Sequence, residues 1–376
     1  MSRVWFSVVV ATAAFWGTAV VKRSPYSYEV TPPVRQWADQ PMKLVAVPLP
    51  TTTTTTTQQH HQWEGQDDEE EDDMFVTSAQ HLAHLHNALI RGYNSIVLQA
   101  PHVLPPTETA ADGGNDGNDD DDEDEDDDDD EDEDDDDDED DEDPDEARHF
   151  IGYARTWVKF LRGHHDDEEA VLFPETASIL HDNTLWGDMY KEHESLVEHI
   201  QALDAHLAHL SANASAYAPA PLLSLLSALR APLEQNLHHE VAHLASLSAH
   251  PAVAPRYTVE RAVAAETLLN WRANSVGAVA GGGGGLVGGT FDVVPLLLLN
   301  VDRGHNDGGN ADWPPMLAPV RWALVNAVGA VHAGRWRFAS CDAWGRPREL
   351  YAVGRAAERR RREQERETKK RGQEEL

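Results

Sequence analysis

The fold of this chain is decided by the stretch His164-His165-Asp166-Asp167-Glu168-Glu169-Ala170-Val171-Leu172-Phe173-Pro174. On an α-helix, residues four apart lie on one face, so His165 and Glu169 are expected side by side. The same row continues through Trp157 and Leu161, so this face is otherwise apolar. Burial of unpaired polar groups costs free energy, and a metal ion would give both side chains a partner. Taken alone, the pair is equally typical of a solvated helix rich in His and Glu.

Three further segments are expected to form amphipathic helices with a polar residue in the apolar row. They begin at Thr77-Ser78 and cover residues 186–210 and 222–248, in addition to the helix over residues 146–180 that carries the stretch above. His86 interrupts the apolar row of the first helix, His193 that of the third, and Asn236 with Glu240 that of the fourth. Interruption of four rows by ligand-type residues is far rarer by chance than interruption of one. The sequence therefore predicts an all-α, up-down-up-down four-helix bundle with a metal ion in its core.

The composition agrees with a metal site made from histidine and carboxylate. Of the 20 histidines, 16 lie between His81 and His250, whereas the chain has a single cysteine, Cys341. One cysteine excludes an intramolecular disulfide framework and a Cys-rich zinc or iron–sulfur site. Imidazole and carboxylate accept iron, zinc or manganese, so the ligand types leave the metal open.

The acidic charge is concentrated in one insert. The formal net charge is −37, and 27 of the negative charges lie in residues 119–146, which leaves about −10 for the rest. We expect residues 113–146 to be a disordered acidic insert, because like charges repel and keep such a run solvated. Nothing in this charge pattern favours nucleic acid as a partner.

The N-terminus predicts a membrane anchor. Residues 4–21 form an uncharged segment of 18 residues, just long enough to span a bilayer. We therefore assign residues 1–23 to a single-pass anchor and a membrane location. The alternative is a cleaved signal peptide and secretion, since small residues lie at Gly17-Thr18-Ala19. Residues 24–76 are expected to be a disordered linker.

The C-terminal third carries weaker signals. Residues 251–353 are Trp-rich, and we expect them to form an extension that packs on the bundle formed by residues 77–250. Residues 354–376 are a charged tail, expected to be a solvated helix or a disordered segment.

Several of these motifs occur together in one known family. His86-Asn87, Arg91-Gly92 and the helical motif that ends in Leu172-Phe173-Pro174 resemble a hemerythrin-like (HHE cation-binding) domain over residues 81–248. The wider chain resembles fungal hemerythrin-like proteins. The resemblance implies ligands around two bridged metal ions: His86, His165, Glu169, His193 and Glu240. Asn236 stands where the family has a ligand histidine, and Glu168, Asn236, His239 and His243 are candidate additional ligands.

The leading functional hypothesis is a non-haem di-iron protein that binds dioxygen or senses iron or redox state. A metal-dependent oxidase or ferroxidase is the alternative, because Glu240 and His243 form the Glu-x-x-His pair of carboxylate-rich di-iron sites. A third hypothesis is an interaction module with a vestigial metal site. The sequence leaves enzymatic activity undecided and favours a binding protein over an enzyme.

Overall fold

The computed structural model describes residues 40–48, 73–106, 143–253, 259–281, 289, 291–304 and 313–374. Within these ranges the ordered elements are helical, apart from one isolated bridge between Cys341 and Pro347. None of the helices in the same ranges is long and apolar enough to cross a membrane. The predicted anchor at residues 1–23 and most of the acidic insert lie outside the described residues.

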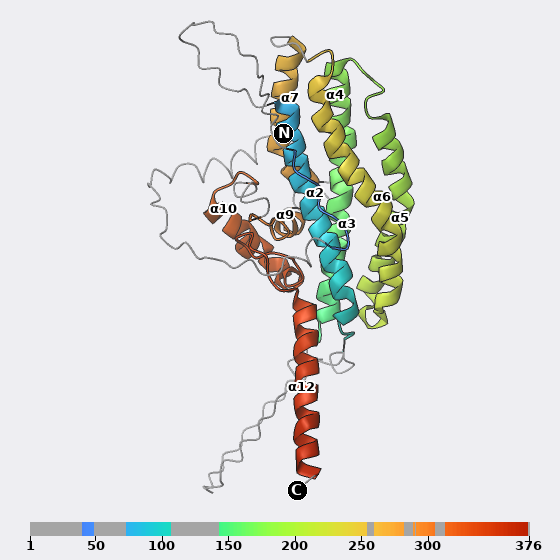
Figure 1. The fold of residues 1–376 in the computed structure, drawn as a ribbon, viewed down its shortest axis with the longest axis vertical. Helices are drawn as coiled ribbons and strands as arrows, with labels where there is room; N and C mark the ends of the chain where they lie inside the picture. The colour runs from blue at the N-terminus through green and yellow to red at the C-terminus, as the bar shows by residue number, and fades with distance from the viewer. Residues whose placement is uncertain are drawn as a thin grey trace, which may run out of the picture.

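Four long helical segments form the bundle. They are α2 (Met74–Gln99), α3 (Glu146–Asp167) with its continuation α4 (Phe173–Leu180), α5 (Gly187–Ala212) and α6 (Pro219–Ser246). Consecutive segments run in opposite directions (Figure 1). Helix α2 packs on α3 and α6, and α5 packs on α3 and α6. These bounds agree with the expected helices, except that α2 begins earlier, where the Asp73 carboxylate accepts from the backbone N–H groups of Phe75 and Val76.

Between α3 and α4 the helix contains one π-helical turn, Glu168–Leu172. Single π turns of this kind are often found at functional sites. This one includes the two glutamates of the stretch that predicted the fold. Beyond it, Pro174 lies in the first turn of α4, where its missing N–H is tolerated.

The separation of α2 and α3 depends on a glycine. A Cβ atom added to Gly92 would lie 2.6 Å from Cδ1 of Trp157 on α3. The Trp157 indole N–H donates to the carbonyl of Leu89, one turn earlier on α2, at 2.8 Å. Since Trp157 is fully buried, the absence of a side chain at Gly92 lets the two helices approach this closely.

A fifth long helix, α7 (Val259–Gly281), covers the α2 and α3 side of the bundle. Trp271 on this helix donates to the Asp167 carboxylate at 2.9 Å, and Arg272 donates to the hydroxyl of Ser78 at 2.7 Å. Helix α7 was not among the helices that we expected from the sequence. His81 is buried under α7, where its Nε2 lies 2.7 Å from the hydroxyl of Ser275, and His84 is buried against Trp313.

The rest of the extension is built from short helices: α9 (Val293–Leu298), α10 (Ala318–Ala323) and α11 (Ala333–Trp336). It packs on the bundle through specific hydrogen bonds. The hydroxyl of Tyr153 donates to the side chain of Asn300 at 3.1 Å, and Gln99 donates to the carbonyl of Phe338 at 2.8 Å. The final helix, α12 (Tyr351–Glu374), points away from the bundle (Figure 1).

Residues 40–48 lie within the segment expected to be a linker, yet they pack against the bundle. Met42 and Val45 are buried, and their backbones pair with two asparagines of α2. The side-chain amide of Asn94 accepts from the Met42 N–H and donates to the Met42 carbonyl; Asn87 does the same for Val45. Each amide thereby mimics one step of a β-ladder.

Candidate metal centre

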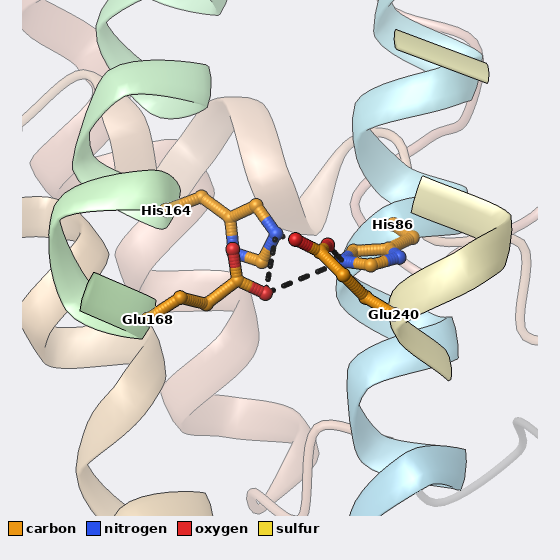
Figure 2. Close-up of side chains that lie close together, drawn as sticks. All are labelled: His86, His164, Glu168 and Glu240. Atoms are coloured by element: carbon orange, nitrogen blue, oxygen red, sulfur yellow. Dashed lines mark hydrogen bonds and ion pairs between the residues drawn. The ribbon is translucent and has the colours of Figure 1, made fainter. Parts of the chain in front are cut away.

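Four buried side chains from four helical elements of the bundle converge at one point. His86 comes from α2, His164 from α3, Glu168 from the π turn and Glu240 from α6. Each offers one ligand atom, and these atoms lie within 4.8 Å of one another. Figure 2 shows the two imidazoles and the two carboxylates directed toward a shared centre. We call these residues the primary cluster.

The distances within the primary cluster are short. Nε2 of His86 lies 2.8 Å from Nε2 of His164 and 3.6 Å from Oε2 of Glu240. Oε1 of Glu168 lies 3.3 Å from Nε2 of His164 and 3.7 Å from Nε2 of His86. The pair His164 and Glu168 is four residues apart, so both face the same side of their helix.

The tautomer of His86 is set by the backbone. Its Nδ1 lies 2.7 Å from the carbonyl oxygen of Leu237, so Nδ1 carries the proton and donates it. Nε2 of His86 therefore presents a lone pair toward the cluster. A backbone carbonyl that orients a histidine in this way is the usual outer partner of a metal-ligating imidazole.

The carboxylates of the cluster are short of hydrogen-bond donors. Both oxygens of Glu168 and Oε2 of Glu240 are buried and have no hydrogen-bond partner among the described residues. Buried carboxylate oxygens are normally paired, because desolvation of an unpaired oxygen is costly. Three unpaired oxygens beside a histidine lone pair fit a divalent cation, which would neutralise the carboxylates and accept the nitrogen.

A second cluster adjoins the first. His165, Glu168 and His193 also bring ligand atoms within 4.8 Å of one another. Glu168 belongs to both clusters, with Oε1 directed to the first and Oε2 at 3.7 Å from Nε2 of His193. The imidazoles of His165 and His193 stack at 4.2 Å, and Nε2 of His165 has no partner within the described part of the chain. A shared carboxylate would bridge two cations.

Burial governs the protonation of the cluster. Burial lowers the pKa of His86 to about 4, and it holds the pKa of His164 and of His165 well below the usual value. Burial, followed by the charge of Glu240, raises the pKa of Glu168 well above its usual value. The histidines are therefore neutral at pH 7, which is the form that binds metal.

His193 behaves differently. Burial alone would lower its pKa, but hydrogen bonds to Glu240 and Glu169 outweigh that effect and raise the pKa. Nε2 of His193 lies 2.7 Å from Glu240 Oε1, and Nδ1 lies 2.8 Å from Glu169 Oε1. His193 thus links the buried cluster to a carboxylate that is 45% exposed.

The structure brings together most of the ligands that the sequence implied, with a shift of one residue on α3. The primary cluster contains His86 and Glu240, and the second cluster contains His165 and His193. Glu169 lies in neither cluster. The inward pair is His164 and Glu168. A step of four residues turns the helix by 400°, so each step moves the side chain 40° around the helix axis. The row counted from Trp157 in such steps therefore leaves the buried face before Glu169.

The additional candidates occupy distinct positions. Asn236 is fully buried and donates to Glu240 Oε1 at 2.9 Å. His239 is part of the surface and lies 3.0 Å from Glu192. His243 packs edge-on against Trp186, with ring centroids 4.8 Å apart, and belongs to neither cluster.

Comparison with known proteins supports the same chemistry. Residues 128–247 match the family model described as the Hemerythrin HHE cation binding domain, which confirms the resemblance for that segment. The dimeric xanthone biosynthesis cluster protein R11 of Cryptosporiopsis sp. (strain 8999) is 23% identical over 276 residues, covering 73% of this chain and 82% of that protein. No solved structure matches the chain significantly. The matched segment contains His164, Glu168 and Glu240, whereas His86 precedes it.

Proposed function

We propose that this chain, whose residues 128–247 match the hemerythrin HHE cation-binding domain, binds two non-haem iron ions in the core of its helical bundle and serves to bind dioxygen or to sense iron or redox state. The observation that carries the metal-binding proposal is the set of three unpaired buried carboxylate oxygens around His86 and His164. Iron would supply reversible redox chemistry when bound.

The residues around the site would orient the ligands, keep the histidines neutral and exclude water. The Leu237 carbonyl fixes the His86 ring, and burial keeps His86 and His164 neutral. Glu168 spans the two clusters. The apolar bundle around them excludes water, which strengthens electrostatic attraction between the carboxylates and a cation.

The proposal is tested by metal analysis and a visible spectrum of the full chain purified under oxygen. We expect close to two iron ions per chain after anaerobic loading with Fe²⁺, and charge-transfer absorption after oxygen is admitted. Removal of metal with a chelator should lower the melting temperature, because a ligand that binds only the native state stabilises it. Absence of metal together with an unchanged melting temperature would favour an interaction module with a vestigial site.

A metal-dependent oxidase is the second proposal. The name of the relative R11 associates that protein with a xanthone biosynthesis cluster. The position of His243, apart from both clusters, speaks against the Glu-x-x-His ligand pair of an oxidase. Multiple turnovers of oxygen consumption by the iron-loaded protein with a reductant would favour the oxidase; a single binding event per site would favour the oxygen carrier.

Membrane attachment through residues 1–23 also stands as a proposal. The uncharged segment at residues 4–21 supports it. Deletion of residues 1–23 should move the protein from the membrane pellet to the soluble fraction. Continued sedimentation with membranes would refute the assignment.

A further inference from the structure

The seam between α5 and α6 carries a partly exposed carboxylate close to the buried clusters. Glu192 lies on α5, and its side chain is 19% exposed. Its Oε1 accepts from Nδ1 of His239 at 3.0 Å and from Nε2 of Gln235 at 3.2 Å, both on α6. These contacts hold the carboxylate at the surface of the seam, where a cation in solvent can reach it.

Asn236 connects this carboxylate to the interior. Its Nδ2 lies 3.4 Å from Glu192 Oε2 and 2.9 Å from Glu240 Oε1, so one amide bridges a surface carboxylate and a cluster carboxylate. The side chain is fully buried, and its Oδ1 has no hydrogen-bond partner among the described residues. A half-turn of the amide would exchange Nδ2 for Oδ1, and thereby replace a donor with an oxygen ligand between the two carboxylates.

Two other sides of the bundle are covered. Residues 40–48 lie over α2 and hydrogen-bond to α6 through the Lys43 carbonyl and His238, with Met42 and Val45 buried. Helix α7 covers α2 and α3, where Trp271 is buried. The α5 and α6 seam thus offers a charged and partly exposed approach to Glu240.

We propose that this seam is the route by which a divalent cation reaches the buried clusters: Glu192 captures the cation from solvent, and Asn236 passes it to Glu240. The inference rests on the proposed metal-binding function and adds the path of loading to it. In this route Asn236 transfers the cation from Glu192 to Glu240. This gives a physical role to an amide at a position where the family pattern places a ligand histidine.

The test is the rate of metal uptake by the full-length, metal-free protein, followed by stopped-flow absorbance with Co²⁺ alone as the probe. Glu192→Gln keeps the shape of the side chain and removes its charge. We expect it to slow uptake about tenfold, in line with electrostatic steering of ligands, while the final number of bound ions stays the same. Uptake by the wild type should also slow more steeply with added salt than uptake by the variant, because salt screens exposed charges.

Glu198→Gln is the matched control, since Glu198 is an exposed glutamate on the same helix. It removes the same charge and should load at the wild-type rate. Release of Co²⁺ to a chelator should slow in Glu192→Gln as well, because a shared route serves both directions.

Four results would overturn the route. Uptake at the wild-type rate by Glu192→Gln, or equal slowing by Glu198→Gln, would show that loading does not depend on this seam, with metal binding itself intact. Loss of bound metal from Glu192→Gln at equilibrium would make Glu192 a ligand and not a capture residue. Failure of the wild type to bind any Co²⁺ would instead refute the proposed metal binding, and the route with it.

Discussion

Nε2 of His86 and Nε2 of His164 lie 2.8 Å apart in the interior of the bundle, although the two residues are 78 positions apart in sequence. The His86 nitrogen carries a lone pair, because its Nδ1 proton is donated to Leu237. Without a cation, the contact is favourable only if His164 donates through Nε2. With a cation, both nitrogens become ligands, and the unpaired oxygens of Glu168 gain a partner.

The assignment of Glu168 as the inward carboxylate leads to the first prediction. Glu168→Gln should abolish most tight metal binding, because an amide oxygen is a weaker ligand than a carboxylate. It should leave the metal-free protein at least as stable as the wild type, since the raised pKa of Glu168 shows that burial favours its neutral form. Metal content and chemical unfolding with and without chelator measure the two effects.

Glu169→Gln is the control for this prediction. It removes the same group from the next residue, where the side chain is 45% exposed and accepts from Nδ1 of His193 outside both clusters. Metal content should fall by less than half. Equal loss in the two variants would return Glu169 to the ligand set that the family resemblance implies.

The second prediction concerns the number of tight sites. The primary cluster offers four ligand residues and the second cluster three, one of them shared. A metal titration should therefore show one tight site and one weaker site. Asn236→His and the size-matched Asn236→Asp should each tighten the weaker site, because residue 236 contacts Glu240 beside His193. Two equally tight sites in the wild type, unaffected by either substitution, would refute this view.

The third prediction concerns the spacing of α2 and α3. Gly92→Ala should weaken metal binding without removal of a ligand, because its Cβ would meet Cδ1 of Trp157 at 2.6 Å and the ring is held by its bond to Leu89. Gly152→Ala is the control: its Cβ would meet Nε of Arg335 at 2.5 Å, and that flexible side chain can move. Affinity for Co²⁺ should fall only in Gly92→Ala. Equal affinities would show that the spacing tolerates a methyl group.

The fourth prediction concerns pH and His81, which lies outside both clusters. Burial lowers the pKa of His81 to about 3, and the ring accepts from Trp313 while it contacts Ser275. Between pH 6.5 and about 3 the unfolded chain binds a proton here that the folded chain does not. The contribution of His81 to the free energy of unfolding is therefore fully present above pH 6.5. It falls as the pH falls, by up to about 1.4 kcal/mol per pH unit.

His81→Gln should remove that dependence. Urea unfolding of the metal-free protein at pH 7, 5.5 and 4.5 should show a shallower decline in the free energy of unfolding than in the wild type. His209→Gln, at an exposed position, should decline as the wild type does. Parallel curves for all three proteins would show that His81 is not held neutral in the fold.

The sequence predicted the bundle well because its four helices combine strong apolar rows with clear ends. It predicted His86, His193 and Glu240 as inward residues, and all three are buried. The buried residues of α5 and α6 alternate steps of three and four, which average close to the true turn of 3.6 residues. On α3 the row was counted in steps of four alone, and the accumulated drift moved the expected pair from His164 and Glu168 to His165 and Glu169.

Two features could not be predicted from local patterns. Helix α7 covers His81 and Trp313 packs against His84, and tertiary contacts of this kind leave no mark on the period of α2 itself. The bond between Asn236 and Glu192 joins two helices and depends on their relative rotation. Periodicity places a residue on a face of its helix, whereas the neighbour that it meets is decided by the fold.

The hydrogen bonds from Asn87 and Asn94 to the backbones of Val45 and Met42 bear on where a folded fragment of this chain should begin. If the chain were shortened to begin at Asp73, both buried amides would lose the backbone groups of Met42 and Val45 that complete them. Loss of these four hydrogen bonds, at about 1 kcal/mol each, would be a large part of the stability of an ordinary domain. The family match begins at residue 128, so a fragment designed on sequence similarity alone would omit α2 and its histidine as well as this brace. We therefore expect a stable fragment to need residues 40–48, far upstream of the segment that matches the family model.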